Sequence, residues 1–483
     1  MRALLVTSIG VACAGAVLLP LAPTESAESM LSGKHSASAG DAAPPAAPRG
    51  PGVAGSDSRA AADNEGSVPG STQSLPLHAR GDGTRSGDRL LSAWEDDPSG
   101  GRRVTSRKVK PFSLVGVVWK DPGALPPGRL QVQTRAADTE KWSEWRTLNT
   151  HGDGGPGPAE RDRSGREALG ASAPMWVGDS TAVRVRILPA TDGRKSGGTP
   201  GGRKGEAGLP DGARLELVDP GKSPRSGSRA GDGAGGGARD DDPAKRPGGV
   251  LPGLNRADTR STYGDDAADA TPSKKDRAED SRIGPRPEIV TRKGWGADES
   301  MREREFSYSR AMKAAFVHHS AETNDYSCGD VPAIIRGIYR YHVTSSRWRD
   351  IGYNFLVDKC GKIYEGRAGG VAKPVMGAHT LGFNADTTGI AVLGTYSKEV
   401  PSKAAKDAVS KLTAWKLGVH GIAANGKVTL TSAGGTKHKK GSKVSFNAVS
   451  GHRDGFVTEC PGEKLYRELP SVRTEAARLQ GRR

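Results

Sequence analysis

A histidine and a cysteine lie close together near the C-terminus, in a loop bounded by glycine and proline. The segment Gly451–Gly462 places His452, Thr458 and Cys460 in the pattern H-x5-T-x-C. Imidazole and thiolate are the ligands that zinc most often takes in proteins. Two ligands do not complete a site, and the best third candidate is His318, far upstream in the segment Ala315–Ser320. Together these residues predict a metal centre.

A set of two histidines and one cysteine leaves the fourth position of a tetrahedral zinc site open, as in catalytic sites. A water bound there has its pKa lowered to about 7. The same set occurs in blue-copper proteins, which also use a weak axial methionine. The nearest methionine, Met376, belongs to another predicted loop. The pattern therefore favours one zinc ion.

The number of cysteines is odd in the chain that would remain after an N-terminal signal is removed. Of four cysteines, Cys13 lies in an N-terminal apolar run, which leaves Cys328, Cys360 and Cys460. One disulfide and one metal thiolate account for three cysteines in an exported chain. We expect Cys328 to pair with Cys360, although the sequence alone leaves the other pairings open.

Residues 1–27 have the features of a secretory signal. Arg2 precedes an apolar run from Ala3 to Leu21, and Ala22 or Ala27 could end the segment. A membrane anchor is the alternative, but the run is short for a span and lacks charge on its far side. We therefore expect a secreted or cell-wall-associated protein that keeps no membrane anchor after cleavage.

The composition divides the chain of 483 residues into ordered and disordered parts. With 67 glycines, 32 prolines and 5% aromatic residues, much of the chain lacks the apolar surface needed to fold. Residues 28–107 and 219–284 are low in complexity, and we expect both to be disordered. Apolar residues concentrate in 108–218 and 285–483, which we predict to be two domains.

The net charge of +16 limits the choice of partner. It would suit nucleic acid inside a cell, but no basic segment with interleaved aromatic residues is present. For an exported protein an anionic cell-wall polymer is the better counterpart, and a solvated surface explains any single charge equally well. We expect a monomer that binds no nucleic acid.

Residues 108–218 alternate apolar and polar residues with period two, which predicts an antiparallel, sandwich-like all-β domain. The runs are Phe112–Trp119, Leu130–Arg135, Ala182–Leu188 and Ala213–Val218. Trp142 and Trp145 could form a sugar-stacking surface, but core packing is the favoured interpretation. No cluster of histidine, cysteine or carboxylate side chains suggests chemistry here, so we assign no enzymatic activity to this domain.

Residues 285–483 have an α/β pattern, which predicts a mixed central sheet flanked by helices. Apolar strands end on His318 and include Ile351–Val357 and Gly389–Gly394. Helices are expected after Asp330 and after Ser402, both good N-caps. Residues 425–446 resemble a Gly- and Lys-rich hairpin. We expect a short helix over 463–469, an interruption at Pro470 and a second helical segment over 471–479.

Five segments of this region resemble, in the same order, the peptidoglycan recognition protein family. That family shares its fold with the phage-lysozyme-type N-acetylmuramoyl-L-alanine amidases, and the resemblance covers about residues 286–480. The segments are Phe316–Ser320, Ile351–Phe355, Ile363–Arg367, Gly377–His379 with Asn384, and Gly451–Asp454 through Cys460–Gly462.

The resemblance implies a zinc amidase that cuts between N-acetylmuramic acid and the L-alanine of the stem peptide in peptidoglycan. It implies His318, His452 and Cys460 as metal ligands, and Tyr353 and Thr458 as catalytic residues. Thr458 replaces a lysine of the phage enzymes, so it brings no positive charge. The resemblance also implies four substrate contacts, which are His319, Arg367, His379 and Asn384. The alternative is a module of the same fold that binds peptidoglycan without cutting it.

Overall fold

The computed structural model describes residues 70–77, 91–92, 94–106, 108–150, 155, 167–189, 208–222, 249–264 and 282–482. The expected signal segment 1–27 lies outside these ranges, as do large parts of both expected linkers. Within the described ranges, no helix has the length and apolar character that crossing a membrane requires.

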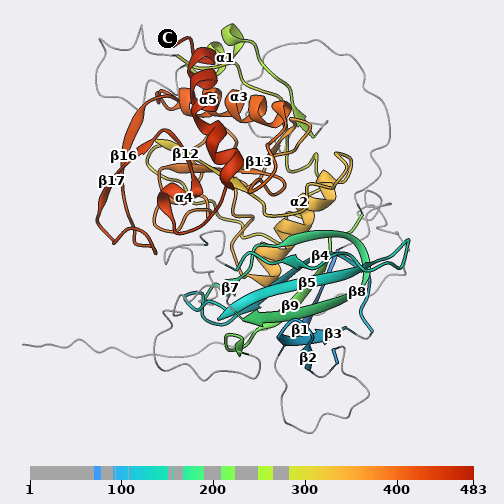
Figure 1. The fold of residues 1–483 in the computed structure, drawn as a ribbon. Coiled ribbons are helices and arrows are strands. Elements are labelled where there is room, and N and C mark those ends of the chain that lie inside the picture. The colour runs from blue at the N-terminus through green and yellow to red at the C-terminus, as the bar shows by residue number, and fades with distance from the viewer. Residues whose placement is uncertain are drawn as a thin grey trace, which may run out of the picture. The chain divides into compact units, whose positions relative to one another are not determined.

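The N-terminal part is an all-β domain (Figure 1). Its hydrogen-bonded strands follow the order β1-β9-β4-β8-β3-β2, while β5 pairs with β8 and β6, and β7 pairs with β4. The strands are β1 Ser71–Pro76, β2 Glu95–Asp97, β3 Gly101–Thr105, β4 Phe112–Trp119, β5 Gly128–Ala136, β6 Arg146–Thr147, β7 Gly170–Ala171, β8 Met175–Pro189 and β9 Arg214–Asp219.

The long strand β8 joins the two layers of this sandwich-like domain. Its first half pairs with β4, and its second half pairs with β3 and β5. Apolar side chains that alternate along these strands, such as Val117, Val132 and Val185, form the core between the layers. The predicted all-β fold is therefore confirmed.

Two expectations for this domain are wrong. Strands β1, β2 and β3 lie within residues 28–107, which we expected to be disordered; β1 finds its partner in β9, far away in sequence. Trp142 and Trp145 are half-buried and outside the core. Their rings instead stack on the guanidinium groups of Arg184 and Arg186, at 3.9 and 4.2 Å.

The C-terminal part has a mixed seven-stranded sheet in the order β10-β11-β14-β13-β15-β12-β18. Strands β13, β15, β12 and β18 run parallel, and β14 is antiparallel to β13. The strands are β10 Val250–Leu251, β11 Ile289–Val290, β12 Ala314–His319, β13 Phe355–Val357, β14 Ile363–Glu365, β15 Thr387–Val392 and β18 Val449–Gly451; β16 Lys427–Thr431 and β17 Lys443–Asn447 form a separate hairpin.

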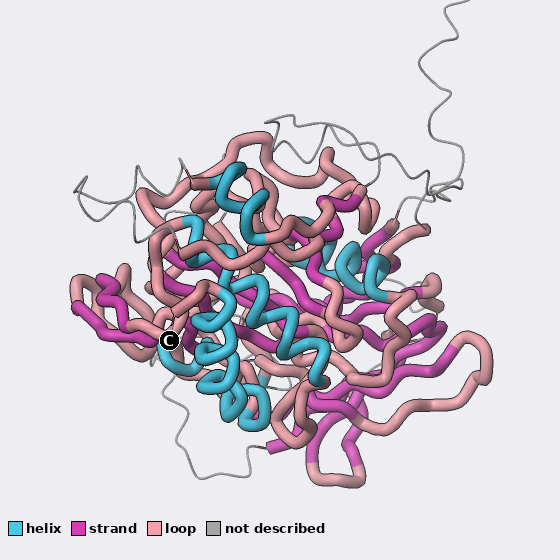
Figure 2. The backbone as a smooth tube through the Cα atoms, turned by 90° about the horizontal axis from the view of Figure 1, so that it is seen from above, coloured by secondary structure: helices cyan, strands magenta, loops and turns pink. Residues whose placement is uncertain are grey.

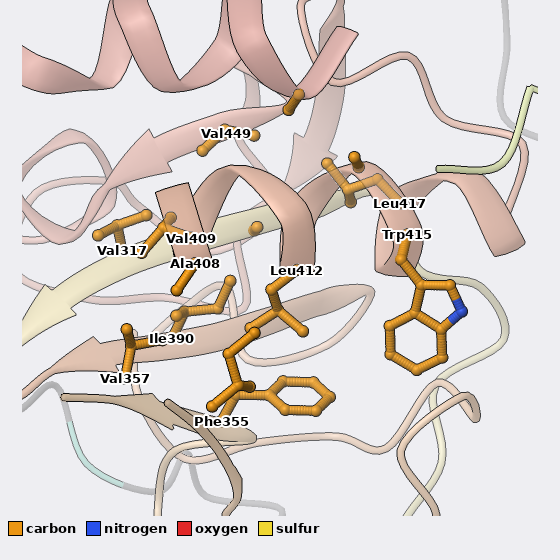
Figure 3. Packing of buried hydrophobic residues seen from close by; sticks show 14 of the residues in the cluster. Val317, Phe355, Val357, Ile390, Ala408, Val409, Leu412, Trp415, Leu417 and Val449 are labelled. Atoms are coloured by element: carbon orange, nitrogen blue, oxygen red, sulfur yellow. The ribbon is translucent and has the colours of Figure 1, made fainter. Parts of the chain in front are cut away.

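Two helices, α3 (Lys403–Val419) and α5 (Glu463–Leu479), cover one face of this sheet. Ser402 caps α3 as expected, since its side chain accepts a hydrogen bond from Ala405 N. In Figure 3 Val409, Leu412 and Trp415 of α3 face the apolar side chains of β12, β13 and β15. Figure 2 shows the helices of this layer side by side above the strands.

Two details of this layer differ from expectation. Helix α5 continues through Pro470 without interruption. Proline removes one backbone donor from a helix, but Leu469 and Val472 on either side of it are buried in the same core, and this packing keeps both halves in line. The expected linker 219–284 also contains β10 and α1 (Arg256–Tyr263), whose Leu251 and Tyr263 belong to that core.

Helix α2 (Val331–Arg340) covers the opposite face of the sheet and continues into one turn of π-helix, Tyr341–Ser345. Its apolar residues share one buried cluster with the all-β domain: Leu114, Val118, Trp176 and Val218 pack with Ile334, Ile338 and Tyr341. The Tyr341 hydroxyl lies 3.2 Å from Val117 O and 3.1 Å from Ser172 O. The two domains therefore share a core.

Candidate metal centre

Two parallel strands bring the predicted histidine ligands together. Strand β12 pairs with β18 in a register that sets Val317 opposite Gly451. A histidine follows each of these two residues. His318 is still in β12, and His452 begins the short helix α4 (His452–Gly455) directly after β18. Because the carboxyl ends of parallel strands meet at one edge of a sheet, the two rings approach to 4.4 Å between centroids.

Cys460 completes the cluster from the loop that follows α4. The loop folds back so that Arg453 N donates to Cys460 O at 2.9 Å. The buried sulfur lies 3.8 Å from His318 Nδ1 and accepts a hydrogen bond from His319 N at 3.4 Å. The ligand atoms of His318, His452 and Cys460 all lie within 4.8 Å of one another.

The chemistry of these three residues fits a zinc ion. Both ring nitrogens of His452 are buried and have no hydrogen-bond partner within the described part of the chain, a costly state unless something else binds them. Burial, followed by the neighbouring histidines, lowers the pKa of His318 and of His452 well below the ordinary range. Neutral imidazole and thiolate are the forms that bind metal.

His379 lies in direct contact with the predicted ligand His318. It is fully buried, with Nδ1 at 3.2 Å from His318 Nε2 and at 3.0 Å from Thr380 Oγ1. The substrate contact expected of this residue stays a prediction, and the contacts that the structure shows for it are with the protein itself. Its geometry is that of a partner that orients the ring of His318, as partners of metal-bound histidines commonly do.

Asn384 also supports the cluster. Its Oδ1 accepts hydrogen bonds from His379 N at 2.8 Å and Thr380 N at 2.7 Å, which fixes the backbone that carries His379. Its Nδ2 donates to Gly155 O of the all-β domain at 3.1 Å. Asn384 therefore links the candidate metal centre to the other domain, a contact that no local sequence pattern predicts.

His319 and Arg367 are held mainly by the protein itself. His319 is buried, its Nδ1 accepts from Tyr396 N at 3.4 Å, and burial lowers its pKa to about 4. The Arg367 guanidinium donates to Ile351 O at 2.9 Å and Met376 O at 3.1 Å. Arg367 also lines a small cavity with Asp350, Phe306 and Met376, so a substrate role for it stays a prediction.

Tyr353 lies beside the metal ligands. Its ring centroid is 5.4 Å from that of His318, and the side chain is buried. Its position is set just before β13, where Tyr353 O accepts from Arg367 N at 2.8 Å. A catalytic role for Tyr353, which the family resemblance implies, stays a prediction.

Thr458 lies in the loop between His452 and Cys460. Its Oγ1 accepts a hydrogen bond from Cys460 N at 3.2 Å, and the half-buried side chain lines a cavity with Ser397, Arg453, Glu459 and Glu463. The hydroxyl keeps its proton available for donation. A catalytic role for Thr458 remains a prediction. The hydrogen bond that its hydroxyl accepts from Cys460 N stabilises the turn that carries Cys460.

Sequence reasoning missed His342, which supports the segment of Tyr353. Its Nδ1 accepts from Gly352 N at 3.2 Å, and its ring stacks on Trp348 at 4.2 Å between centroids. The ring lies 6.0 Å from that of Tyr353. The one signal in the sequence was that His342 and Trp348 lie shortly before Tyr353. Their contact depends on the π-helical turn that carries His342.

The disulfide has the expected partners. Cys328 and Cys360 are joined at a sequence separation of 32, and the bond ties the loop before α2 to the turn between β13 and β14. Among the described residues, Cys460 is the cysteine that takes no part in a disulfide.

Comparisons with known proteins agree with this geometry. Residues 308–463 match the family model described as N-acetylmuramoyl-L-alanine amidase. Residues 59–207 match a model described as Rv3811 N-terminal galactose-binding domain-like. This second match starts well before residue 108 and thus includes β1, β2 and β3 in the all-β domain.

Individual relatives match the C-terminal part. Peptidoglycan-recognition protein SC2 of Drosophila simulans is 30% identical over 183 residues, which cover 38% of this chain and 84% of that protein. Human N-acetylmuramoyl-L-alanine amidase is 32% identical over 183 residues, covering 37% of this chain and 27% of that protein. The solved structure of Drosophila PGRP-LB is 28% identical, covers 38% of this chain and 92% of that one, and has a TM-score of 0.31.

Proposed function

Because the chain belongs to the peptidoglycan recognition protein family, we propose that its C-terminal domain is a zinc-dependent N-acetylmuramoyl-L-alanine amidase. The bond cut is the amide between the lactyl group of N-acetylmuramic acid and the L-alanine of the stem peptide. We further propose that the protein is exported and acts as a monomer on cell-wall peptidoglycan. The convergence of His318, His452 and Cys460 beside Tyr353 carries this proposal.

The three ligands have distinct tasks. His318 and His452 offer neutral imidazole nitrogens, and Cys460 offers a sulfur that the His319 amide stabilises as thiolate. Bound zinc would supply polarisation of the scissile carbonyl and a water of lowered pKa. Since all three ligands are buried, bulk water is largely kept from them, and electrostatic interactions there are stronger than in solution.

Tyr353 has two tasks in this proposal. Amide hydrolysis passes through a tetrahedral species whose negative charge must be stabilised, and a positioned phenol donates a hydrogen bond to that oxygen. The leaving amine of L-alanine also needs a proton, and in this proposal Tyr353 relays to it the proton that the attacking water loses. Thr458 would offer a second, neutral hydrogen bond to the same oxygen.

The test is release of free stem peptide from purified cell-wall peptidoglycan, measured before and after treatment with a chelator and again after zinc is restored. We expect chelation to abolish release and zinc to restore it. Tyr353→Phe should lose about 10²-fold in kcat, the scale for one oxyanion donor, while its zinc content stays at one ion per chain.

Two matched results decide between cleavage and binding alone. Cys460→Ser should lose zinc and activity together, whereas Lys411→Gln, an exposed change in α3, should keep both. Undiminished release after chelation would contradict the zinc mechanism. Retention of the protein on peptidoglycan with no release of peptide from zinc-loaded wild type would instead identify a binding module.

A further inference from the structure

The hairpin formed by β16, β17 and their connecting loop carries an unusual concentration of positive charge. We call residues 427–447 the lysine hairpin. It contains five lysines, and from Gly426 to Arg453 the sequence has no aspartate or glutamate. The lysines are Lys427, Lys437, Lys439, Lys440 and Lys443. Figure 1 shows the hairpin as a separate two-stranded unit beside α4.

One face of the two strands packs against the domain. Leu430 and Phe446 are buried in a small apolar cluster with Phe316 and Phe383, and Phe446 meets their rings at 5.3 and 4.9 Å between centroids. Because side chains alternate between the two faces of a strand, this packing turns the neighbouring polar positions outward. All five lysines are exposed.

The positive charge of the hairpin is not neutralised locally. Within the part of the chain that the structure describes, none of the five lysines forms an ion pair with a carboxylate. Lys437 donates to a backbone carbonyl, Arg453 O. Like charges that remain uncompensated on one small element repel one another and attract a polyanion.

The hairpin loop is bound to the segment that carries the metal ligands. Val457 N donates to Thr436 Oγ1 at 3.3 Å, and the His438 ring lies 3.4 Å from Asp454 O. With the bond from Lys437 to Arg453 O, three contacts tie the tip to the short stretch between His452 and Cys460. A polymer held at the metal centre would therefore pass close to the loop of the hairpin, which carries Lys437, Lys439 and Lys440.

We propose that the lysine hairpin binds carboxylates of polymeric peptidoglycan next to the bond that is cut. This inference rests on the proposed function for the identity of the polymer. Stem peptides carry free carboxylates at regular intervals along the wall, and a five-residue strand is about 17 Å long, so the hairpin reaches beyond a single cleaved unit. The hairpin thereby favours polymeric wall over short soluble fragments.

The experiment compares two variants with equal charge. The first replaces four hairpin lysines by glutamine and leaves Lys437, which holds the loop: Lys427→Gln, Lys439→Gln, Lys440→Gln and Lys443→Gln. The control removes four exposed lysines elsewhere: Lys141→Gln, Lys293→Gln, Lys398→Gln and Lys411→Gln. Both have the same net charge, so a difference between them reports position and not total charge.

The measurement is cosedimentation with insoluble peptidoglycan over a series of salt concentrations, which needs no catalytic turnover. The hairpin variant should bind about five-fold more weakly at low salt, with a flatter dependence on salt, because fewer charges contribute. The control should bind like wild type. Peptidoglycan whose carboxylates have been converted to amides should bind wild type and the hairpin variant alike.

Three results would overturn the inference. The hairpin variant and the control could lose affinity for peptidoglycan equally, or wild type could bind amidated peptidoglycan as tightly as untreated peptidoglycan. The third is tighter binding of wild type to duplex DNA than to peptidoglycan at the same salt. Activity provides a separate readout. On a soluble monomeric muropeptide the hairpin variant should keep wild-type kcat and KM, and on insoluble wall only its KM should rise. If wild type cleaves nothing, the amidase proposal fails while the cosedimentation result still stands.

Discussion

The Nε2 atom of His318 lies 3.2 Å from Nδ1 of His379, and both rings are completely buried. One nitrogen of His318 is thereby held by a second imidazole, while the other faces the sulfur of Cys460 at 3.8 Å. This division of the ring leaves a single nitrogen for a metal.

Replacement of His379 should weaken metal binding without removing a ligand. In His379→Ala the ring of His318 loses the partner that orients it, and loss of such a partner typically costs 10- to 100-fold in metal affinity. Competition with a chromogenic chelator measures this change. His420→Ala, which removes a half-buried histidine whose Nε2 contacts Ala372 O, is the control and should bind zinc like wild type. Equal zinc affinity in His379→Ala and wild type would refute the orienting role.

Metal binding should stabilise the folded domain. A ligand that binds only the folded state raises stability by about 2.7 kcal/mol at one hundred times its Kd, so chelation should lower the melting temperature. Cys460→Ser should melt at one temperature with or without chelator, because it lacks the thiolate. A chelator effect of the same size in both proteins would argue against this site.

The shared core of the two domains should be sensitive at Gly116. A Cβ there would lie 2.4 Å from ring atoms of Tyr341, so Gly116→Ala forces packed groups apart and should cost about 1–3 kcal/mol of unfolding free energy. Gly253→Ala is the control, since its Cβ would meet its nearest atoms at 3.5 Å. Denaturant unfolding measures both, and equal midpoints for the two variants would contradict the shared core.

Tyr341→Phe tests the polar part of the same contact. The change keeps the ring but removes the hydroxyl bonded to Val117 O and Ser172 O, and a lost neutral hydrogen bond costs about 1 kcal/mol. Hydrogen exchange of the segment 341–353 should then become faster, because the turn that carries His342 loses its fixed end. Unchanged exchange there would show that the hydroxyl contact does not secure the turn.

Glu365 should make stability depend on pH. Burial raises the pKa of this carboxyl from its ordinary 4.5 to about 7, although Arg292 N donates to it and the Arg292 charge lies nearby. The folded state therefore keeps a proton that the unfolded state loses above pH 4.5. The contribution of Glu365 is fully present below pH 4.5, is lost as the pH rises to 7, and amounts to about 3 kcal/mol.

Glu365→Gln isolates this effect, because glutamine resembles the protonated acid. Urea unfolding at pH 4.5 and pH 7.5 should give a smaller fall in stability for the variant than for wild type. Glu303→Gln, at a carboxylate that faces Arg349 at 2.6 Å, should leave the difference between the two pH values nearly as in wild type. Identical pH dependence in wild type and Glu365→Gln would show that Glu365 is ionised in the folded protein.

Local patterns predicted the strands and helices of the C-terminal domain well. Apolar residues repeat every second position in a strand and every third or fourth position in a helix, and the repeat indicates which face is buried. The sequence therefore predicted β12, β15, α2 and α3 with small shifts at their ends. The same reasoning failed for β1, β2, β3 and α1. These elements are short and rich in polar residues, and partners far away in sequence, such as β9 for β1, give them their order.

The sequence by itself determined which residues could bind a metal, because ligand chemistry belongs to the residue type: His318, His452 and Cys460. Tyr353 was expected beside them only through the family resemblance. The tertiary structure alone decided what surrounds them. The order of strands in the sheet set His379 in contact with His318, π-helical winding after α2 brought His342 under Tyr353, and packing across the sequence placed the lysine hairpin beside the metal loop. Such contacts depend on how distant surfaces fit together, and no local repeat in the chain records that fit.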